Sequence, residues 1–256
     1  MSIRFAFLGS GSRGNALLIE TSHVRVLLDC GFAARETERR LTLLGVDPET
    51  VTAILLTHEH GDHMRGVGAM ARRYQLPVWM TPGTYHGASY GALIDLNLID
   101  CHAGPFAIGD LSILPFPVPH DSREPCQFLF SNAGQRLGVL TDTGHITPHI
   151  THTLQGCDSL ILEFNHDPGM LVNGPYPRAL QARVGGTHGH LNNLQAVQLL
   201  EQLTTVGLSQ LVASHISEKN NSQDLVKSLI ASQLPDMEAQ LSFASQDRVT
   251  DWFTNE

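Results

Sequence analysis

The sequence has 256 residues, of which 42% are hydrophobic and 16% charged, and its formal net charge is −9 with histidine neutral. These values are typical of an ordinary globular protein and argue against a surface that is basic throughout and coats nucleic acid. No apolar run approaches the ~20 residues of a membrane helix, so no membrane association is expected. Lysine stands only at Lys219 and Lys227, and the other cations are arginines, which suit phosphate recognition. The charge of the chain therefore does not decide whether its partner is a nucleic acid.

Hydrophobic periodicity predicts strands and helices that alternate in two successive halves. The first half has predicted strands at 3–9, 15–21, 24–30 and 52–57, and predicted helices at 33–45 and 64–74. In the second half strands dominate 106–141, followed by a helix at 148–154, a strand at 158–164, an irregular stretch at 167–187, a helix at 191–204, a strand at 210–214, a helix at 222–232 and a closing strand. Because no linker interrupts this pattern, one α/β domain over residues 1–256, with two sheets covered by helices, is predicted.

The N-terminal stretch and the cysteines bear on where the protein is located. The N-terminal stretch "MSIRFAFLGSGSRGN" has an arginine inside its apolar part and then turns to glycine. It is therefore predicted to be a first strand and not a signal peptide. Cysteines occur without clustered spacing, at Cys30, Cys101, Cys126 and Cys157. Free thiols in a reducing cytoplasm are expected. The sequence leaves open whether the chain forms a homo-oligomer.

The strongest motif is "LLTHEHGDH", residues 55–63. An apolar strand ends at Thr57, and four side chains with metal-binding atoms follow at once: His58, His60, Asp62 and His63. Alternation in an extended segment points His58 and His60 the same way, and the tight turn redirects the other two. Imidazole and carboxylate ligands suit zinc, manganese or iron. The alternative, a loop of exposed polar residues, does not account for this spacing directly after a buried strand.

The pattern T-H-x-H-x-D-H after a hydrophobic strand resembles the metallo-β-lactamase superfamily, which has a four-layered αββα sandwich fold. The resemblance implies further ligands in "PVPHD", "LTDTG" and "ASHIS", namely His120, Asp142 and His215. It implies that one ion takes His58, His60 and His120, that a second takes Asp62, His63 and His215, and that Asp142 bridges them. Asp29, which ends "VLLD", would orient the first histidine loop.

The same resemblance implies two divalent metal ions, with zinc or manganese the first candidates and iron or nickel the next. A metal-bridging hydroxide would then form at neutral pH, because bound metals lower the pKa of water from 15.7 toward ~7. Asp62 and Asp142 are accordingly expected to be catalytic as well as ligands. The ligand set does not identify the metal, since availability decides among several.

Within the superfamily, the sequence looks most like the YycJ/WalJ group, phosphodiesterase-like proteins described as 5′-to-3′ DNA exonucleases. The matching stretches are "GSGSRGNA", "LEFNHDPGML", "NGPYPRALQARV", "GHLNN" and "SHISEKNN". Asn192 replaces the group's usual serine, and "GTH" precedes "GHL" where an acidic–basic pair is common. Three other branches fit less well: secreted β-lactamases have a signal peptide, glyoxalase II has an added helical domain, and RNase Z has a long arm.

Outside the metal ligands, His190 is the first candidate for a substrate or general-acid role. It precedes an apolar helix whose N-terminal amides and dipole would attract a phosphate, and it could protonate the leaving oxygen. The alternative is that His190 has only a structural role at the start of the helix, with Asn192 or Asn193 capping the first turn. His188 is expected to have no functional role. Glu163 is interpreted as a structural hydrogen bonder. The remaining candidates for substrate contacts are Arg13, His166, Arg183, Ser217, Asn220 and Asn221.

The sequence leaves three classes of function open. The first is hydrolysis of phosphodiesters, with DNA as the substrate that the resemblance implies and small phosphodiesters or cyclic nucleotides as alternatives. The second is hydrolysis of a thioester or lactone, in which the same hydroxide attacks a carbonyl carbon. The third is a metal-binding regulatory module without turnover, against which the complete set of seven ligands argues.

Overall fold

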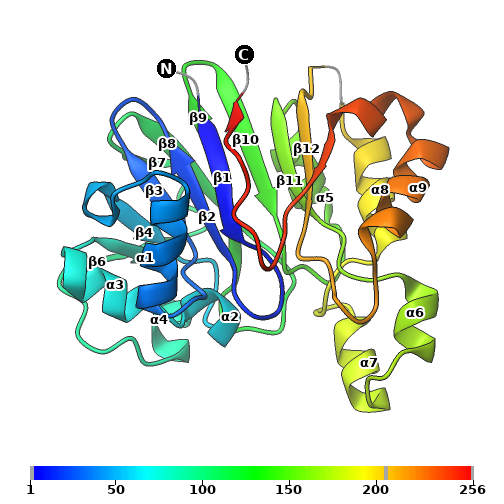
Figure 1. Cartoon of the computed structure of the whole chain (residues 1–256), viewed down its shortest axis with the longest axis horizontal. Helices are drawn as coiled ribbons and strands as arrows, with labels where there is room; N and C mark the ends of the chain where they lie inside the picture. Colours follow the sequence, from blue (N-terminus) through cyan, green and yellow to red (C-terminus); the bar gives the residue numbers. More distant parts are fainter. Residues whose placement is uncertain (1–2, 205–206, 255–256) are drawn as a thin grey trace. The chain divides into compact units, whose positions relative to one another are not determined.

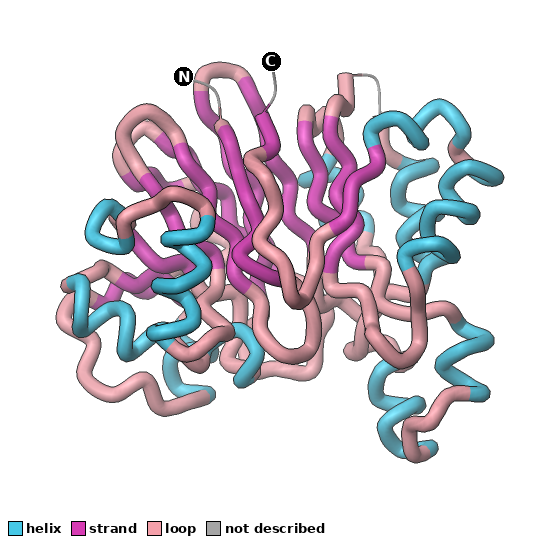
Figure 2. The backbone as a smooth tube through the Cα atoms, in the orientation of Figure 1, coloured by secondary structure: helices cyan, strands magenta, loops and turns pink. Residues whose placement is uncertain are grey.

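The computed structural model describes residues 3–204 and 207–254 (Figures 1 and 2). The chain forms two compact units. Unit 1 comprises Met1–Pro117, Ser122–Gln135 and Ser245–Glu256, and unit 2 comprises Val118–Asp121 and Arg136–Ala244. That the two units make one domain stays a prediction. No helix among the described residues is long and apolar enough to cross a membrane.

The main sheet of unit 1 has the strand order β14-β1-β2-β3-β4-β5-β6. These strands are β1 (Arg4–Gly9), β2 (Ala16–Glu20), β3 (Arg25–Leu28), β4 (Ala53–Leu55), β5 (Val78–Met80), β6 (Leu96–Leu98) and β14 (Phe253–Thr254). β1 pairs antiparallel with β14 and β2, as does β2 with β3, whereas β3, β4, β5 and β6 run parallel. The carboxyl ends of β3 and β4 therefore meet at one edge, which positions the residues that follow them.

Helices follow the parallel strands of unit 1: α1 (Ala34–Leu43), the 3-10 helix η1 (Pro48–Thr50), α2 (Gly61–Met64), α3 (Val67–Tyr74) and α4 (Pro82–Gly87). Leu27 and Ile54 of the sheet are buried in one cluster with Leu41 of α1 and Met70 of α3. Burial of each such side chain contributes roughly 1.5–3 kcal/mol. The cluster thus fixes α1 and α3 on the sheet. Unit 1 also contains three antiparallel strands, β7 (Phe106–Ile108), β8 (Leu111–Pro117) and β9 (Cys126–Asn132).

Unit 2 has four parallel strands, β10 (Gln135–Leu140), β11 (Ser159–Glu163), β12 (Gln210–Ser214) and β13 (Leu241–Phe243). Its helices are α5 (Pro148–Leu154), α6 (Pro168–Asn173), α7 (Arg178–Val184), α8 (Asn193–Gln202) and α9 (Gln223–Gln233), with the 3-10 helix η2 (Pro235–Gln240). α8 and α9 contact each other and lie side by side in Figure 1. Parallel strands bring their carboxyl ends to one edge, so Asp142, Glu163 and His215 are delivered together.

Three of these strand-end residues have an unusual backbone. Asp29 after β3, Asp142 after β10 and His215 after β12 have φ angles of 60°, 51° and 52°. This left-handed region is uncommon for residues other than glycine, and its occupation costs of order 1–3 kcal/mol. The turn sharply redirects the chain just where each strand ends.

Two predicted elements differ from those observed. The helix expected at 64–74 is divided into α2 and α3 around Gly66, whose Cα lies so close to Phe32 that an added Cβ would be 2.2 Å from the Phe32 carbonyl oxygen. The stretch 167–187, expected to be irregular, contains α6 and α7. α6 forms there because the Asp167 side chain caps its first turn, accepting from the Met170 N–H at 2.8 Å.

Candidate metal centre

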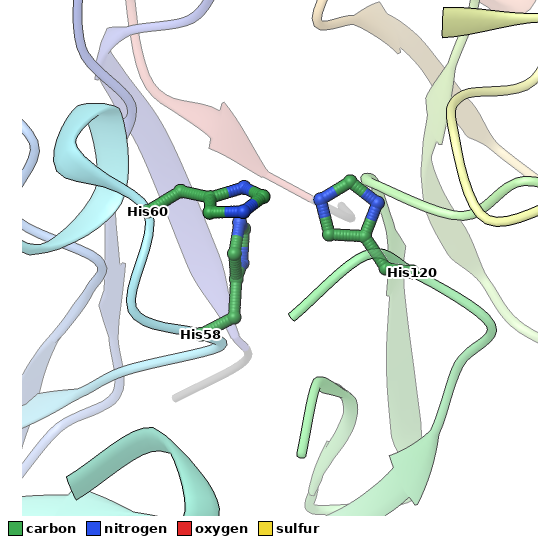
Figure 3. A group of neighbouring side chains, drawn as sticks. All are labelled: His58, His60 and His120. Atoms are coloured by element: carbon green, nitrogen blue, oxygen red, sulfur yellow. The ribbon is translucent and has the colours of Figure 1, made fainter. Parts of the chain in front are cut away.

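In unit 1, the loop between β4 and α2 carries the four side chains of the strongest motif. His58 and His63 are each 1% exposed. Figure 3 shows that the side chains of His58 and His60 both leave this loop, and their rings lie edge to face with centroids 4.6 Å apart. The rings of His58 and His63 are 4.2 Å apart. Buried imidazoles such as those of His58 and His63 require partners for their ring nitrogens.

Asp29 determines how this loop presents its imidazoles. Its carboxylate accepts from the Thr57 backbone N–H at 2.9 Å, from the Thr57 hydroxyl at 3.0 Å and from His63 Nδ1 at 2.7 Å. An ionised carboxylate only accepts, so the Thr57 hydroxyl must give its proton to Asp29. The same hydroxyl oxygen, 2.9 Å from His58 Nδ1, then accepts from that nitrogen. Nε2 of both His58 and His63 is thereby left as the lone-pair nitrogen, the form that a metal requires.

Asn15 marks the point at which two of these ligand atoms converge. Its side-chain nitrogen lies 3.1 Å from His63 Nε2 and 3.3 Å from Asp62 Oδ2. Asn15 itself is held by its Oδ1, which accepts from the Gly11 N–H at 2.8 Å. A hydrogen-bond donor that two such atoms face indicates a position suited to a cation.

In unit 2, Glu163 is the central residue of a second cluster. It is fully buried, and its carboxylate accepts from His190 Nδ1 at 2.8 Å and from His215 Nδ1 at 2.9 Å. Asp142, Glu163, His190 and His215 offer ligand atoms that all lie within 4.8 Å of one another. Burial by itself raises the pKa of Glu163, but the two imidazoles lower it more, so the net pKa lies below its usual range. The carboxylate is therefore ionised, and His215 presents Nε2.

His120 lies in Val118–Asp121, the short segment of unit 2 that follows β8; it is the third side chain drawn in Figure 3. It is 4% exposed, and its Nδ1 lies 3.0 Å from the carbonyl oxygen of Gly189, to which it donates. Nε2 is again the nitrogen left with a lone pair. Burial lowers the pKa of His120, with Asp142 opposing that shift. The ring thus stays neutral, as a metal ligand must be.

The donor set tests whether divalent metals fit these residues. Four imidazoles have Nδ1 engaged by a carboxylate, a hydroxyl or a carbonyl, and two aspartates provide oxygen. Histidines that bind metal through one nitrogen and donate through the other to such groups are the usual arrangement in proteins. Mixed nitrogen and oxygen ligands suit zinc, manganese or iron. The residues present therefore fit divalent metals.

The start of α8 shows which of the two readings of "GHLNN" the fold supports. Asn192 is the N-cap: its Oδ1 accepts from the Gln195 N–H at 2.9 Å, and Gln195 Oε1 accepts from the Asn192 N–H at 2.9 Å. The Asn193 N–H donates to the carbonyl oxygen of His166 at 3.0 Å. The expectation of free amides that attract a phosphate there is therefore wrong for these donors, because the capping box and His166 occupy them.

His190 itself stays a candidate, since it lies before this cap. Its side chain is 19% exposed, and its Nδ1 contacts Glu163, which leaves Nε2 for another partner. His188 is exposed, and its Nδ1 lies 3.3 Å from the Thr187 hydroxyl. The two histidines thus differ in burial and contacts, and the roles expected for them stay predictions.

The residues predicted to contact substrate lie in varied surroundings, and their role stays a prediction. Arg13 and Arg183 are in exposed ion pairs with Asp247 and Asp121. Ser217 accepts in a turn from the Asn220 N–H at 3.2 Å. The other three, which are buried, are His166, Asn220 and Asn221.

Two of these buried side chains have evident structural partners. Asn221 and Asn193 form a reciprocal amide pair at 2.8 and 3.0 Å, which ties the turn before α9 to the start of α8. His166 is 2% exposed, its Nδ1 lies 3.3 Å from Asn165 Oδ1, and burial lowers its pKa to about 4. These contacts stabilise the fold of unit 2.

Sequence reasoning missed two residues that shape the cluster. Asn15 lies in the motif "GSGSRGNA", which was the signal in the sequence that could have identified it. Gly189 contributes through its backbone carbonyl, which no side-chain pattern reveals. An added Cβ at Gly189 would lie 2.2 Å from the carbonyl oxygens of Arg183 and Val184, so only glycine fits there.

Comparisons with known proteins agree with this geometry. Residues 24–216 match a family described as a beta-lactamase superfamily domain. An exodeoxyribonuclease YycJ from Bacillus anthracis is 30% identical over 237 residues, covering 91% of this chain and 90% of the relative. An exodeoxyribonuclease WalJ from Streptococcus pneumoniae is 29% identical over 239 residues, covering 91% and 89%. The crystal structure of the metallo-beta-lactamase fold protein YhfI from Bacillus subtilis superposes with a TM-score of 0.75 at 15% identity, over 98% of this chain and 99% of that one.

Proposed function

Because the chain belongs to the metallo-β-lactamase superfamily and, within it, to the YycJ/WalJ group, we propose that it is a dinuclear-metal phosphodiesterase acting as an exonuclease on DNA. Membership makes the chain a metal-dependent hydrolase, and the predicted αββα fold class is confirmed. The observation that carries the proposal is the hydrogen-bonding pattern that His58, His63 and His215 have in common. In each of them a hydrogen bond fixes Nδ1 and leaves Nε2 to bind metal.

Two divalent ions, zinc or manganese, are proposed on the ligands that the sequence indicated. One ion is assigned to His58, His60 and His120, the second to Asp62, His63 and His215, with Asp142 shared between them. When bound, such ions supply an activated water and neutralise charge on a phosphate. The chain's own contribution is to hold the imidazoles in one tautomer, through Asp29 and Glu163, so that little reorganisation accompanies binding.

His190 is proposed as the proton donor to the oxygen that leaves phosphorus. Glu163 accepts from its Nδ1, which orients the ring, so that a proton taken up at Nε2 can be passed to the leaving oxygen. The partly exposed ring can be reached by a substrate, unlike the buried His166. The general-acid role thus rests on orientation and access together.

DNA is proposed as the substrate because two relatives are named exodeoxyribonucleases. The match to this chain covers about nine tenths of each relative's length. Arg13 and Arg183 are the arginines proposed to contact phosphate, and both would exchange a surface ion pair for that contact. Such exposed pairs are worth only about 0–1 kcal/mol, so a phosphate can compete with them. Cytoplasmic location and homo-oligomerisation stay predictions.

One panel of assays tests the proposal. The purified protein is analysed for bound metals and then incubated with duplex DNA labelled at its 5′ ends, with bis-p-nitrophenyl phosphate and with an acyl thioester. The expected result is metal-dependent release of labelled nucleotides and hydrolysis of the small phosphodiester. Cleavage of the thioester without cleavage of either phosphodiester would overturn the proposal, as would a metal-loaded protein with no hydrolytic activity.

A further inference from the structure

We propose that the cleft between α5 and α8 of unit 2 binds a nucleobase of the substrate strand. The cleft has a volume of about 610 Å³ and lies within unit 2. That volume is within the ~300–1,000 Å³ range of sites for small ligands. The inference deepens the proposed function and rests on it, since it assigns a place to the substrate next to the scissile phosphate.

The lining of the cleft comprises eight polar residues with Ile146 and Pro148, and it carries no carboxylate, lysine or arginine. It combines the amides of four glutamines with two imidazoles and two threonine hydroxyls: Gln155, Gln195, Gln198, Gln202, His145, His152, Thr147 and Thr151. A phosphate would require cations, which this lining lacks. A base edge instead presents neighbouring donors and acceptors, and a glutamine amide offers one of each in a fixed geometry. Imidazole rings also stack on bases.

Six of these eight side chains already have hydrogen-bond partners, among them His145 and Thr147, whose hydroxyl accepts from the Ile150 N–H at 3.2 Å. The Thr151 hydroxyl donates to Gln202 Oε1 at 3.3 Å, Gln155 Nε2 donates to the Gln202 carbonyl oxygen at 3.0 Å, and Gln195 is part of the capping box. The side chains of Gln198 and His152, by contrast, are exposed and make no hydrogen bond within residues 3–204 and 207–254. The cleft thus has a fixed frame and two side chains whose hydrogen-bonding groups are available to a ligand.

Both walls of the cleft continue from segments that carry site residues. His145 is three residues after Asp142, and its Nδ1 donates to the carbonyl oxygen of Thr187 at 2.8 Å. Gly144 packs closely on the segment that contains Thr187 and leads to His190. An added Cβ on Gly144 would be 2.3 Å from the Thr187 carbonyl carbon. The other wall, α8, begins shortly after His190. The end of the cleft at His145 thus adjoins the segment that leads to His190, and there the next base of a strand held by Asp142 and His190 would enter it.

The test compares intact and abasic DNA. Binding of the metal-loaded full chain is measured by fluorescence anisotropy with single-stranded oligonucleotides whose phosphorothioate linkages resist hydrolysis. One has bases and one has the same backbone without bases. Wild type should bind the intact strand roughly tenfold more tightly, the gain of one bidentate contact to a base edge. In the double variant Gln198→Ala/His152→Ala this ratio should fall close to one, whereas the matched control Gln233→Ala on α9 should keep it.

Two results would overturn the inference: a wild-type ratio close to one, or a double variant that keeps the wild-type ratio while its thermal unfolding midpoint is unchanged. The proposed function fails separately. If no phosphodiester is hydrolysed but the ratio behaves as expected, the cleft assignment holds and the reaction does not. If DNA is hydrolysed and the ratio is insensitive to the two substitutions, the reaction holds and the cleft assignment is wrong.

Discussion

Buried carboxylates determine at the scale of single residues which nitrogen each histidine presents. Asp29 in unit 1 and Glu163 in unit 2 each accept from an imidazole Nδ1 at 2.7 to 2.9 Å. Glu163 holds two rings at once, His190 and His215, and so connects the proposed proton donor to a proposed ligand. Removal of its charge should disturb both.

Glu163→Gln is expected to lower metal affinity and turnover by roughly 10- to 100-fold, the usual effect of losing a group that orients a ligand. The amide keeps the shape but can direct its NH₂ toward an imidazole and reverse the tautomer. Metal content after dialysis and kcat on bis-p-nitrophenyl phosphate measure the effect. Glu201→Gln on the exposed face of α8 is the matched control. Unchanged metal content and kcat in Glu163→Gln would contradict the orienting role.

His190→Ala should reduce turnover on the order of 10²-fold, because a positioned general acid contributes that much. Metal content should stay at the wild-type value, since His190 is not among the proposed ligands. Atomic absorption on the purified variant provides the check. A variant that had lost its metal would show that His190 is a ligand after all.

Asp142 combines a functional side chain with a left-handed backbone. Asp142→Ala and Asp142→Gly should both abolish hydrolysis, because each removes the shared carboxylate. Glycine pays no steric cost at φ 51°, so Asp142→Gly should be about 1 kcal/mol more stable than Asp142→Ala. Urea unfolding of the metal-free variants measures this difference. Equal stabilities, or a more stable alanine variant, would be inconsistent with strain at this residue.

Among the elements, α8 shows how local sequence fixes a wall of the proposed cleft. Its capping box joins Asn192 and Gln195 by two hydrogen bonds of 2.9 Å each. Its buried face includes Val197 and Leu200. The cap determines where the helix begins, and hence which side chains line the cleft.

Asn192→Ala should destabilise the protein by about 1 kcal/mol, the typical cost of losing an N-cap. Asn192→Ser should restore most of that loss, because serine accepts the same hydrogen bond. Chemical denaturation of both variants measures the free energy of unfolding. Equal destabilisation by serine and alanine would show that the side-chain cap is not the cause.

The sequence predicted what depends on local pattern and missed what depends on distant contacts. Strand ends placed Asp29, Asp142 and His215 correctly after apolar strands, because periodicity and polarity change there. The break at Gly66 depends on Phe32, more than thirty residues away, and no local signal reveals that contact. The bridging role of Glu163 likewise depends on the parallel alignment of three strands. The sequence predicted that Glu163 forms structural hydrogen bonds, which it does, but it did not identify His190 and His215 as the partners.

For the molecule as a whole, buried histidines make stability depend on pH. The pKa of His166 is about 4 in the folded chain, below its ordinary value of 6.5. The unfolded chain therefore takes up a proton between these values that the folded chain does not. The contribution of His166 to stability is complete above pH 6.5 and is lost as the pH falls toward 4.

His166→Gln should accordingly reduce the pH dependence of the free energy of unfolding between pH 6.5 and 4. Wild type is expected to lose on the order of 2 kcal/mol more than the variant over this range. Urea denaturation in the presence of a chelator makes the measurement independent of metal release. Parallel pH profiles for the two proteins would show that His166 titrates normally in the folded chain.

The left-handed residues at the ends of β3, β10 and β12 have a consequence for how the protein can evolve. Asp29, Asp142 and His215 occupy backbone positions at which glycine or asparagine would relieve strain. Asp29 and His215 also hold buried hydrogen bonds with Thr57, His63 and Glu163, so a lineage released from selection for hydrolysis would gain stability mainly by replacing Asp142. Natural copies that have become inactive should carry glycine or asparagine at residue 142 and melt at higher temperature. Directed evolution for heat resistance alone should select the same replacements, so such screens need a simultaneous requirement for activity.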